Sequence, residues 1–65
     1  MFKKKLGKNI VSGDIVCFSD NSVDLVLRIE QEEHTIWCDG LALENGEIDC
    51  YRIAAEHEYS VINNQ

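Results

Sequence analysis

An alternation of apolar and polar positions, bounded by turn-forming residues, is the feature that most restricts the fold of this chain. Val23, Leu25, Leu27 and Ile29 recur at every second position. A period of two is typical of a β-strand that buries one face. We therefore predict a strand over residues 23–30, with these four side chains facing the core of a small all-β domain.

A second β signal is the dipeptide Asn45-Gly46, which lies between two β-like runs. Asn-Gly favours the type I′ turn of a two-residue hairpin, because both turn positions take a positive φ. The predicted hairpin pairs Leu43 with Ile48 and Leu41 with Cys50, all on one face of the sheet.

Further β-like runs cover residues 15–18, 34–43 and 57–62, where β-branched and aromatic residues gather. Gly40 interrupts the second of these runs, and a glycine inside a strand usually marks a bulge or a bend. Residues 53–56 are too few for a stable helix and predict one helical turn. Five strands with a helical turn before the last resemble a small SH3-like, partly open barrel.

The limits of these runs give the predicted domain organisation. Residues 1–9 lack periodicity and lie at a terminus, so we interpret them as a flexible basic arm. Residues 10–62 form a single SH3-like β domain, and residues 63–65 form a polar tail.

The length of 65 residues leaves little room for a buried catalytic cleft. Small chains bury a smaller fraction of their surface than large ones, and a core of this size supplies only about 3–5 kcal/mol of net stability. Carboxylates are abundant throughout the chain, so their pairing carries no information about acid–base catalysis. We predict that the protein is not an enzyme and has no catalytic residue.

The three cysteines, Cys17, Cys38 and Cys50, are an odd number and lie within β-like runs. They lack the close pairing of structural zinc ligands, and no apolar segment of signal-peptide or membrane-spanning type accompanies them. We interpret them as small core residues of a reduced, cytoplasmic protein. The prediction is no metal, no cofactor and no membrane association.

The formal charge of −6 is unevenly distributed. Four of the six cations lie within the first eight residues, and from residue 9 onward only Arg28 and Arg52 oppose all twelve carboxylates. An acidic body repels nucleic acid and attracts basic partners. The acidity also keeps a small protein soluble, which is the simplest explanation of the composition.

Three segments resemble the YodC-like family of small bacterial and phage proteins. They are Ser12-Gly13-Asp14-Ile15-Val16, the run from Leu25 to Glu30, and Thr35-Ile36-Trp37-Cys38. The resemblance covers roughly residues 12–62 and implies an SH3-like barrel. The chain differs from this family in its acidic hairpin and in lacking a proline before the last strand. Barrels of this type host unrelated activities, so the function has to be inferred from a site.

The acidic turns are the best candidate for such a site, because charges on turns project into solvent and can meet a partner. Trp37 and Tyr51 could add an aromatic anchor, although Trp37 fits the core of a small β domain as well as a binding face. We predict a protein-binding module, of bacterial or phage type, that occupies a basic surface of a partner. The predicted partner-binding residues are Glu30, Glu32, Glu33, Glu44, Glu47, Trp37 and Tyr51.

The alternative is a nucleic-acid-associated barrel that uses the basic arm and an aromatic face. Its predicted binding residues are Lys3, Lys4, Lys5 and Lys8. Four charges on a flexible arm give a weak, salt-sensitive attraction that the acidic body opposes. We therefore expect no strong nucleic-acid binding.

Overall fold

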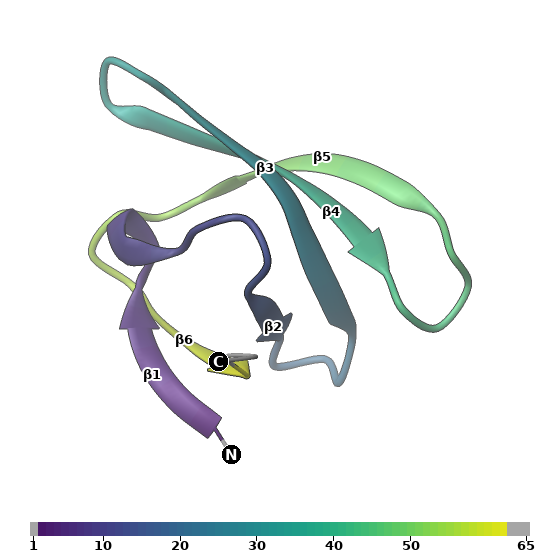
Figure 1. The fold of residues 1–65 in the computed structure, drawn as a ribbon. Coiled ribbons are helices and arrows are strands. Elements are labelled where there is room, and N and C mark those ends of the chain that lie inside the picture. Colours follow the sequence, from purple (N-terminus) through teal and green to yellow (C-terminus); the bar gives the residue numbers. More distant parts are fainter. Residues whose placement is uncertain (1, 63–65) are drawn as a thin grey trace.

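The computed structural model describes residues 2–62 as one open antiparallel sheet of six strands (Figure 1). Residue 1 and the predicted polar tail at 63–65 lie outside the described residues. The sheet order is β1-β6-β2-β3-β4-β5, so β1 and β5 are its two edges. The all-β prediction is confirmed. The strands are β1 (Phe2–Leu6), β2 (Ile15–Cys17), β3 (Val23–Glu32), β4 (Thr35–Ala42), β5 (Ile48–Ile53) and β6 (Glu58–Ile62).

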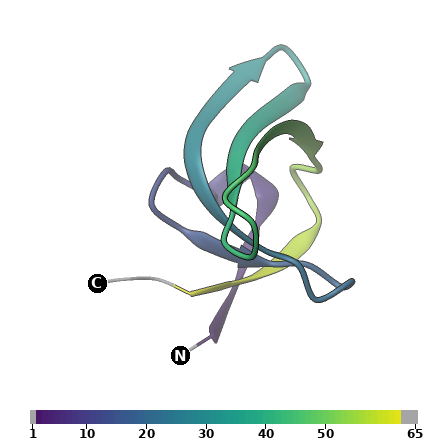
Figure 2. The same cartoon turned by 90° about the vertical axis from the view of Figure 1, so that its right-hand side faces the viewer.

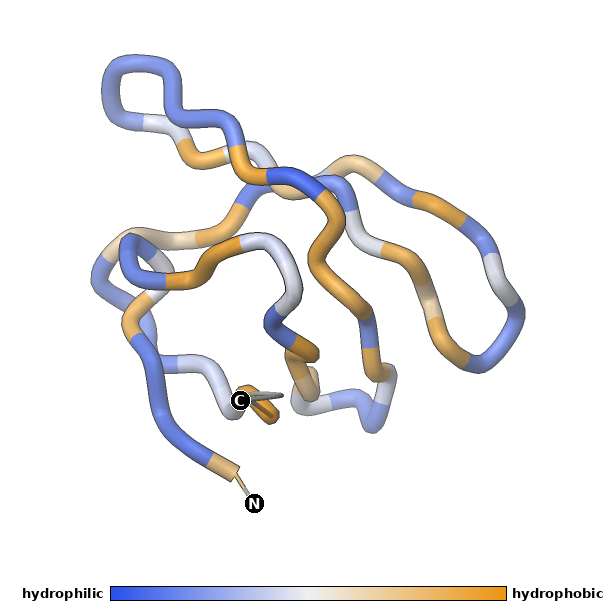
Figure 3. Tube along the Cα trace, viewed as in Figure 1, coloured by the Kyte–Doolittle hydropathy of each residue, from blue (hydrophilic) through white to orange (hydrophobic). Residues whose placement is uncertain are grey.

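The sheet is strongly curved, and the long hairpin of β3 and β4 dominates its shape (Figures 1 and 2). The β3–β4 turn extends to one side of the molecule and the β4–β5 loop to the other (Figure 1). The β3–β4 turn is hydrophilic, whereas the β4–β5 loop combines hydrophilic residues with the apolar Leu43 (Figure 3).

The core lies on one face of this curved sheet. Its most enclosed side chains are Val16, Val26, Cys38 and Val61, one from each of the four inner strands β2, β3, β4 and β6. The remaining buried apolar residues are Ile10, Ile36 and Ile53, and partly buried aromatic rings pack around them. Because the protein is small, these few side chains supply most of the apolar burial that stabilises the fold.

A bulge in β3 divides the strand, so the predicted inward orientation is wrong for Val23, Leu25 and Leu27 and correct for Ile29. Val26 pairs with Gly40 and Arg28 with Asp39, so Leu27 has no partner in β4 and is 41% exposed. Before the bulge, Asp24 and Val26 are the buried residues, and after it Ile29 packs on the core. One extra residue reverses which positions face inward. Gly40 had predicted a bulge or a bend in its own strand. A bulge is present, but it lies in β3, the strand that pairs with Gly40.

The β4–β5 hairpin forms with a different register and turn from those predicted. Leu41 pairs with Ile48, and the Ala42 N–H donates to the Glu47 carbonyl (2.8 Å), which leaves residues 43–46 as the loop. Gly46 has φ 76°, but Asn45 does not have a positive φ, so the turn is not of type I′. A longer loop shifts the register by two residues, which moves Leu43 out of the sheet pairs.

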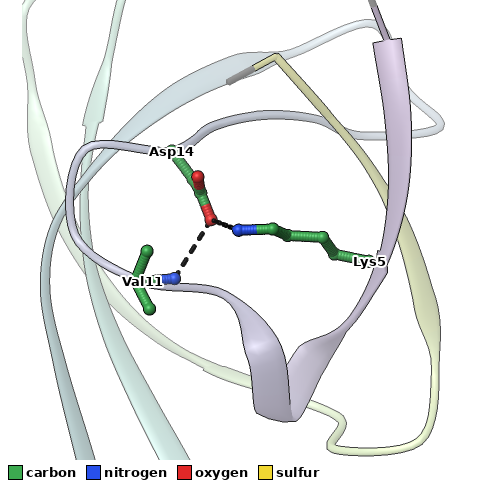
Figure 4. Close-up of polar contacts among 3 residues, drawn as sticks. All are labelled: Lys5, Val11 and Asp14. Atoms are coloured by element: carbon green, nitrogen blue, oxygen red, sulfur yellow. Dashed lines mark hydrogen bonds and ion pairs between the residues drawn. The ribbon is translucent and has the colours of Figure 1, made fainter. Parts of the chain in front are cut away.

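The predicted flexible arm at residues 1–9 is also wrong for the part that the structure describes. Residues 2–6 form β1, which pairs with β6 from Phe2–Ile62 to Leu6–Glu58. The Lys5 ammonium lies 2.8 Å from the Asp14 carboxylate, which also accepts the Val11 N–H at 3.1 Å (Figure 4). Backbone pairing and this buried ion pair order a segment whose composition alone resembles a tail.

The helical turn predicted for residues 53–56 is a reverse turn instead. The His57 N–H donates to the Ala54 carbonyl (3.3 Å), and Ile53 still belongs to β5. Within residues 2–62 the only helical element is the 3₁₀ turn η1 (Gly7–Asn9), which follows β1. With β1 added, the sheet has six strands rather than the five predicted.

Candidate partner-binding surface

Trp37 lies on the outer face of the sheet, which answers the question that its sequence context leaves open. Its neighbours Ile36 and Cys38 are 3% and 1% exposed, so the alternation along β4 turns the indole outward, where it is 36% exposed. In the sheet register Trp37 lies between Glu30 of β3 and Arg52 of β5. An aromatic ring is thus flanked by charged neighbours on both sides.

A shallow pocket of about 230 Å³ lies beside the indole. Arg28 and Glu30 form an ion pair across its rim, with 2.9 Å between the guanidinium and the carboxylate. A hydrogen bond to the Asp39 carboxylate raises the pKa of the exposed Cys50 thiol, so this thiol stays protonated at neutral pH. An indole face next to carboxylates suits a cationic side chain. The pocket is lined by Arg28, Glu30, Trp37, Asp39 and Cys50.

The acidic residues do not form one surface. Glu32 ends β3 and Glu33 follows it, whereas Glu44 lies in the β4–β5 loop and Glu47 lies between this loop and β5. These two groups are separated by the eight residues of β4, or about 25 Å of extended chain (Figure 1). Of the predicted acidic set, the structure brings only Glu30 next to Trp37.

The four carboxylates at the two ends of β4 have no intramolecular counter-ion in the part of the chain that the structure describes. The ion pairs found there are Lys5–Asp14, Lys8–Glu56 and Arg28–Glu30. Glu32, Glu33, Glu44 and Glu47 belong to none of them and are all exposed. Their charge is therefore available to an external partner.

Tyr51 faces the opposite side of the sheet from Trp37. Its hydroxyl donates to Asp24 (2.9 Å), and its ring packs edge-on against Phe18. Burial, followed by the hydrogen bond to Asp24, raises the pKa of Tyr51 far above the ordinary phenol value. Tyr51 and Trp37 therefore do not belong to one aromatic binding surface.

Asp24 is the residue of this region that sequence reasoning missed. It is 8% exposed and accepts the Tyr51 hydroxyl, and Gly40 lies in β4 beside both groups. Burial raises the pKa of the nearby Cys38 thiol, so Cys38 is an inert core residue. Only Gly40 signalled this site, because a side chain there would occupy the space that Tyr51 and Asp24 need.

The lysines of the alternative hypothesis divide into two groups. Lys5 and Lys8 are engaged in ion pairs, with Asp14 at 2.8 Å and with Glu56 at 3.4 Å. Lys3 and Lys4 are exposed on β1. Lys4 lines an open groove of about 910 Å³ between β1, β6 and the end of β2. The aromatic lining of this groove is Phe2, Phe18, His57 and Tyr59.

No protein-family model matches the chain, and neither a curated protein nor a solved structure matches it either. Within the described residues, no helix is both long and apolar enough to cross a membrane. In the same part of the chain, histidine, cysteine and carboxylate side chains do not gather into a group of three that could hold a metal ion.

Proposed function

We propose that this chain is a small, non-enzymatic, acidic protein-binding module that occupies a basic surface of a partner protein. In this proposal it is an accessory factor of bacterial or phage type, related to the YodC-like family and built on an SH3-like, partly open barrel. The observation that carries the proposal is the set of exposed carboxylates at both ends of β4 that have no ion-pair partner within residues 2–62.

The physical basis is long-range electrostatic attraction. Exposed charges raise the rate at which a partner of opposite charge arrives in the right orientation, and salt weakens this effect. The exposed indole of Trp37 then offers a short-range contact, since tryptophan is enriched among residues that dominate binding energy. Charge would govern the encounter, and the aromatic face would govern how long the complex lasts.

The test begins with capture of partners from the native host and identification by mass spectrometry. Association rates are then measured for two charge-matched variants, Glu32→Lys/Glu33→Lys and Glu44→Lys/Glu47→Lys. Each reversal changes the net charge by two, so both variants move from −6 to −2. We expect each to slow association by about tenfold at low salt and to unfold at nearly the parent denaturant concentration.

One combination of results would contradict the proposal. If both variants bind at the parent rate while Trp37→Ala abolishes binding in a folded protein, the acidity serves only solubility. The working surface would then be the outer face around the indole rather than the acidic turns.

A second candidate function, nucleic-acid association, is favoured by the groove that combines Lys4 with aromatic rings. Bases stack on such rings, and lysines attract the phosphates. Glu56 and Glu58 line the same groove and oppose this function. Submicromolar binding of single-stranded RNA or DNA at physiological salt, lost in a Lys3→Glu/Lys4→Glu variant, would replace the first proposal with this one.

A further inference from the structure

The free edge of β5 exposes hydrogen-bonding groups of its backbone. Antiparallel strands alternate between residues that bond to the neighbour and residues that point away from it. Since the Ala42 N–H bonds to the Glu47 carbonyl, Glu47, Asp49 and Tyr51 direct their backbone groups toward β4. The N–H and carbonyl groups of Ile48, Cys50 and Arg52 therefore point outward.

This edge lacks several of the devices that usually prevent strand addition, and its charged side chains are Asp49 and Arg52. β5 contains no proline or lysine, and its register with β4 has no bulge. Its side chains from Ile48 to Cys50 are exposed, and Ile48 is 63% exposed. Among residues 2–62, β4 is the only strand that pairs with β5. The edge is thus a template for an additional strand.

The side chains of β5 define what such a strand should carry. Asp49 lies on the same face of β5 as Tyr51 and Ile53, and Glu47 directly precedes the strand on that face. Ile48, Cys50 and Arg52 lie on the other face. A strand lying beside β5 would place its alternate residues next to these two sets. Basic residues complement the carboxylates on the first face, whereas an apolar residue suits Ile48 and avoids repulsion from Arg52 on the second.

We infer that the β5 edge binds an extended segment of the partner in which basic and apolar residues alternate, added to the sheet by β-augmentation. This inference rests on the proposed function, because it names the part of the basic partner that would dock. Main-chain hydrogen bonds supply affinity, and the alternating side chains supply selectivity.

A second copy of the chain fits this edge less well. A two-fold axis at Asp49 would oppose two carboxylates, and an axis at Arg52 would oppose two guanidinium groups. An axis at Cys50 or Tyr51 would leave Asp49 opposite Tyr51 or Ile53, without a cation. Each copy also has a net charge of −6, which disfavours self-association.

The experiment uses the full chain and a synthetic peptide of about eight residues that alternates lysine with valine. Amide hydrogen exchange is measured by NMR with and without the peptide. We expect at least about tenfold slower exchange at Ile48, Cys50 and Arg52 in the complex. Lys4 is the internal control, because its N–H points outward from the opposite edge, as the Gly7–His57 hydrogen bond shows.

Two proline variants then separate the edges. Cys50→Pro removes an outward N–H of β5, and Lys4→Pro removes an outward N–H of β1. We expect the first to weaken peptide binding by about tenfold and the second to leave it unchanged, with both proteins folded. The same peptide with alternate backbone N-methyl groups keeps its charge and should bind about tenfold more weakly.

The remaining outcomes overturn the inference and leave the proposed function to its own test. Salt-sensitive peptide binding without protection of the β5 amides would place the basic ligand elsewhere on the module. Protection at Lys4 instead would assign the ligand to β1. Protection of the β5 amides that rises with protein concentration alone would identify a second copy as the occupant. Absence of peptide binding at low salt would also contradict the inference.

Discussion

The two edge strands of the sheet are both attached to a buried aspartate, but by different chemistry. On β1 the ammonium of Lys5 bonds to Asp14, which is 3% exposed, and on β5 the hydroxyl of Tyr51 bonds to Asp24, which is 8% exposed. The first anchor is an ion pair, and the second uses a neutral donor. Each buried carboxylate has thus acquired a partner from an edge strand, as the cost of burying an unpaired charge requires.

The comparison extends to how the edges meet solvent. β1 carries three consecutive lysines, Lys3 to Lys5, a composition that discourages pairing with another chain. β5 has no lysine, and its charged residues are one carboxylate, Asp49, and one guanidinium, Arg52. The two edges of one small sheet therefore differ in the charge that they present to solvent.

The largest expected loss of stability comes from removing the ion pair between Lys5 and Asp14. Asp14→Ala should destabilise the protein by about 3 kcal/mol, because it leaves the Val11 N–H and the mostly buried Lys5 ammonium without their acceptor. Chemical denaturation measures the loss. The matched control is Glu56→Ala, since Lys8–Glu56 is an exposed pair with Glu56 76% exposed, and it should cost less than about 0.5 kcal/mol. Equal losses in the two variants would show that the Lys5–Asp14 pair stabilises the protein no more than an exposed ion pair does.

The neutral anchor is tested through Gly40. A Cβ at this position would lie 2.5 Å from the Tyr51 hydroxyl and 3.0 Å from the Asp24 carboxylate, so Gly40→Ala must displace their hydrogen bond. We expect a loss of about 2 kcal/mol in the free energy of unfolding. In a Tyr51→Phe background the same substitution should cost less than half as much, and additive costs in this double-mutant cycle would contradict the coupling.

The contrast between the edges also explains which features could be predicted from the sequence. The strand positions followed from the period of two and from turn residues, because both are local properties of the chain. The inward orientation of Asp24 could not, since the extra residue in β3 changes the phase of the alternation without changing its composition. Trp37 follows the ordinary alternation with Ile36 and Cys38, but Gly40 had left the phase of β4 open.

The edge strand β1 was harder to predict because its stability is not local. Residues 2–6 are mostly lysine and form a strand only because β6 supplies the backbone partners and Asp14 receives Lys5. The acidic residues were recognised by composition, yet their division between the two ends of β4 depends on the hairpin topology. Composition identified the charge of the candidate site, and only the fold located it.

A smaller effect is expected at the loop that leads into β5. Gly46 has φ 76°, and its N–H donates to the Ala42 carbonyl at 2.8 Å. Gly46→Val should cost somewhat more than about 1 kcal/mol, because a β-branched residue is strained at positive φ. Gly46→Asn is the control and should cost less, since asparagine tolerates this conformation. If thermal unfolding shows no difference between the two variants, the loop does not hold the register of β5.

The smallest expected effect is a pH dependence of stability that comes from the Tyr51–Asp24 hydrogen bond. Burial and the hydrogen bond to Asp24 raise the pKa of Tyr51 in the folded state, whereas in the unfolded chain it is about 10. Above that pH the unfolded state holds fewer protons than the folded state, so stability falls as pH rises toward the folded pKa and is fully retained below pH of about 10. The parent should therefore lose stability in alkaline solution relative to Tyr51→Phe, measured as the difference in denaturation midpoint. The subtraction cancels contributions that the two proteins share. A constant difference from pH of about 8 to 11 would mean that the Tyr51 phenol ionises as freely in the folded protein as in water, and that the β5 edge is not held through a protonated hydroxyl.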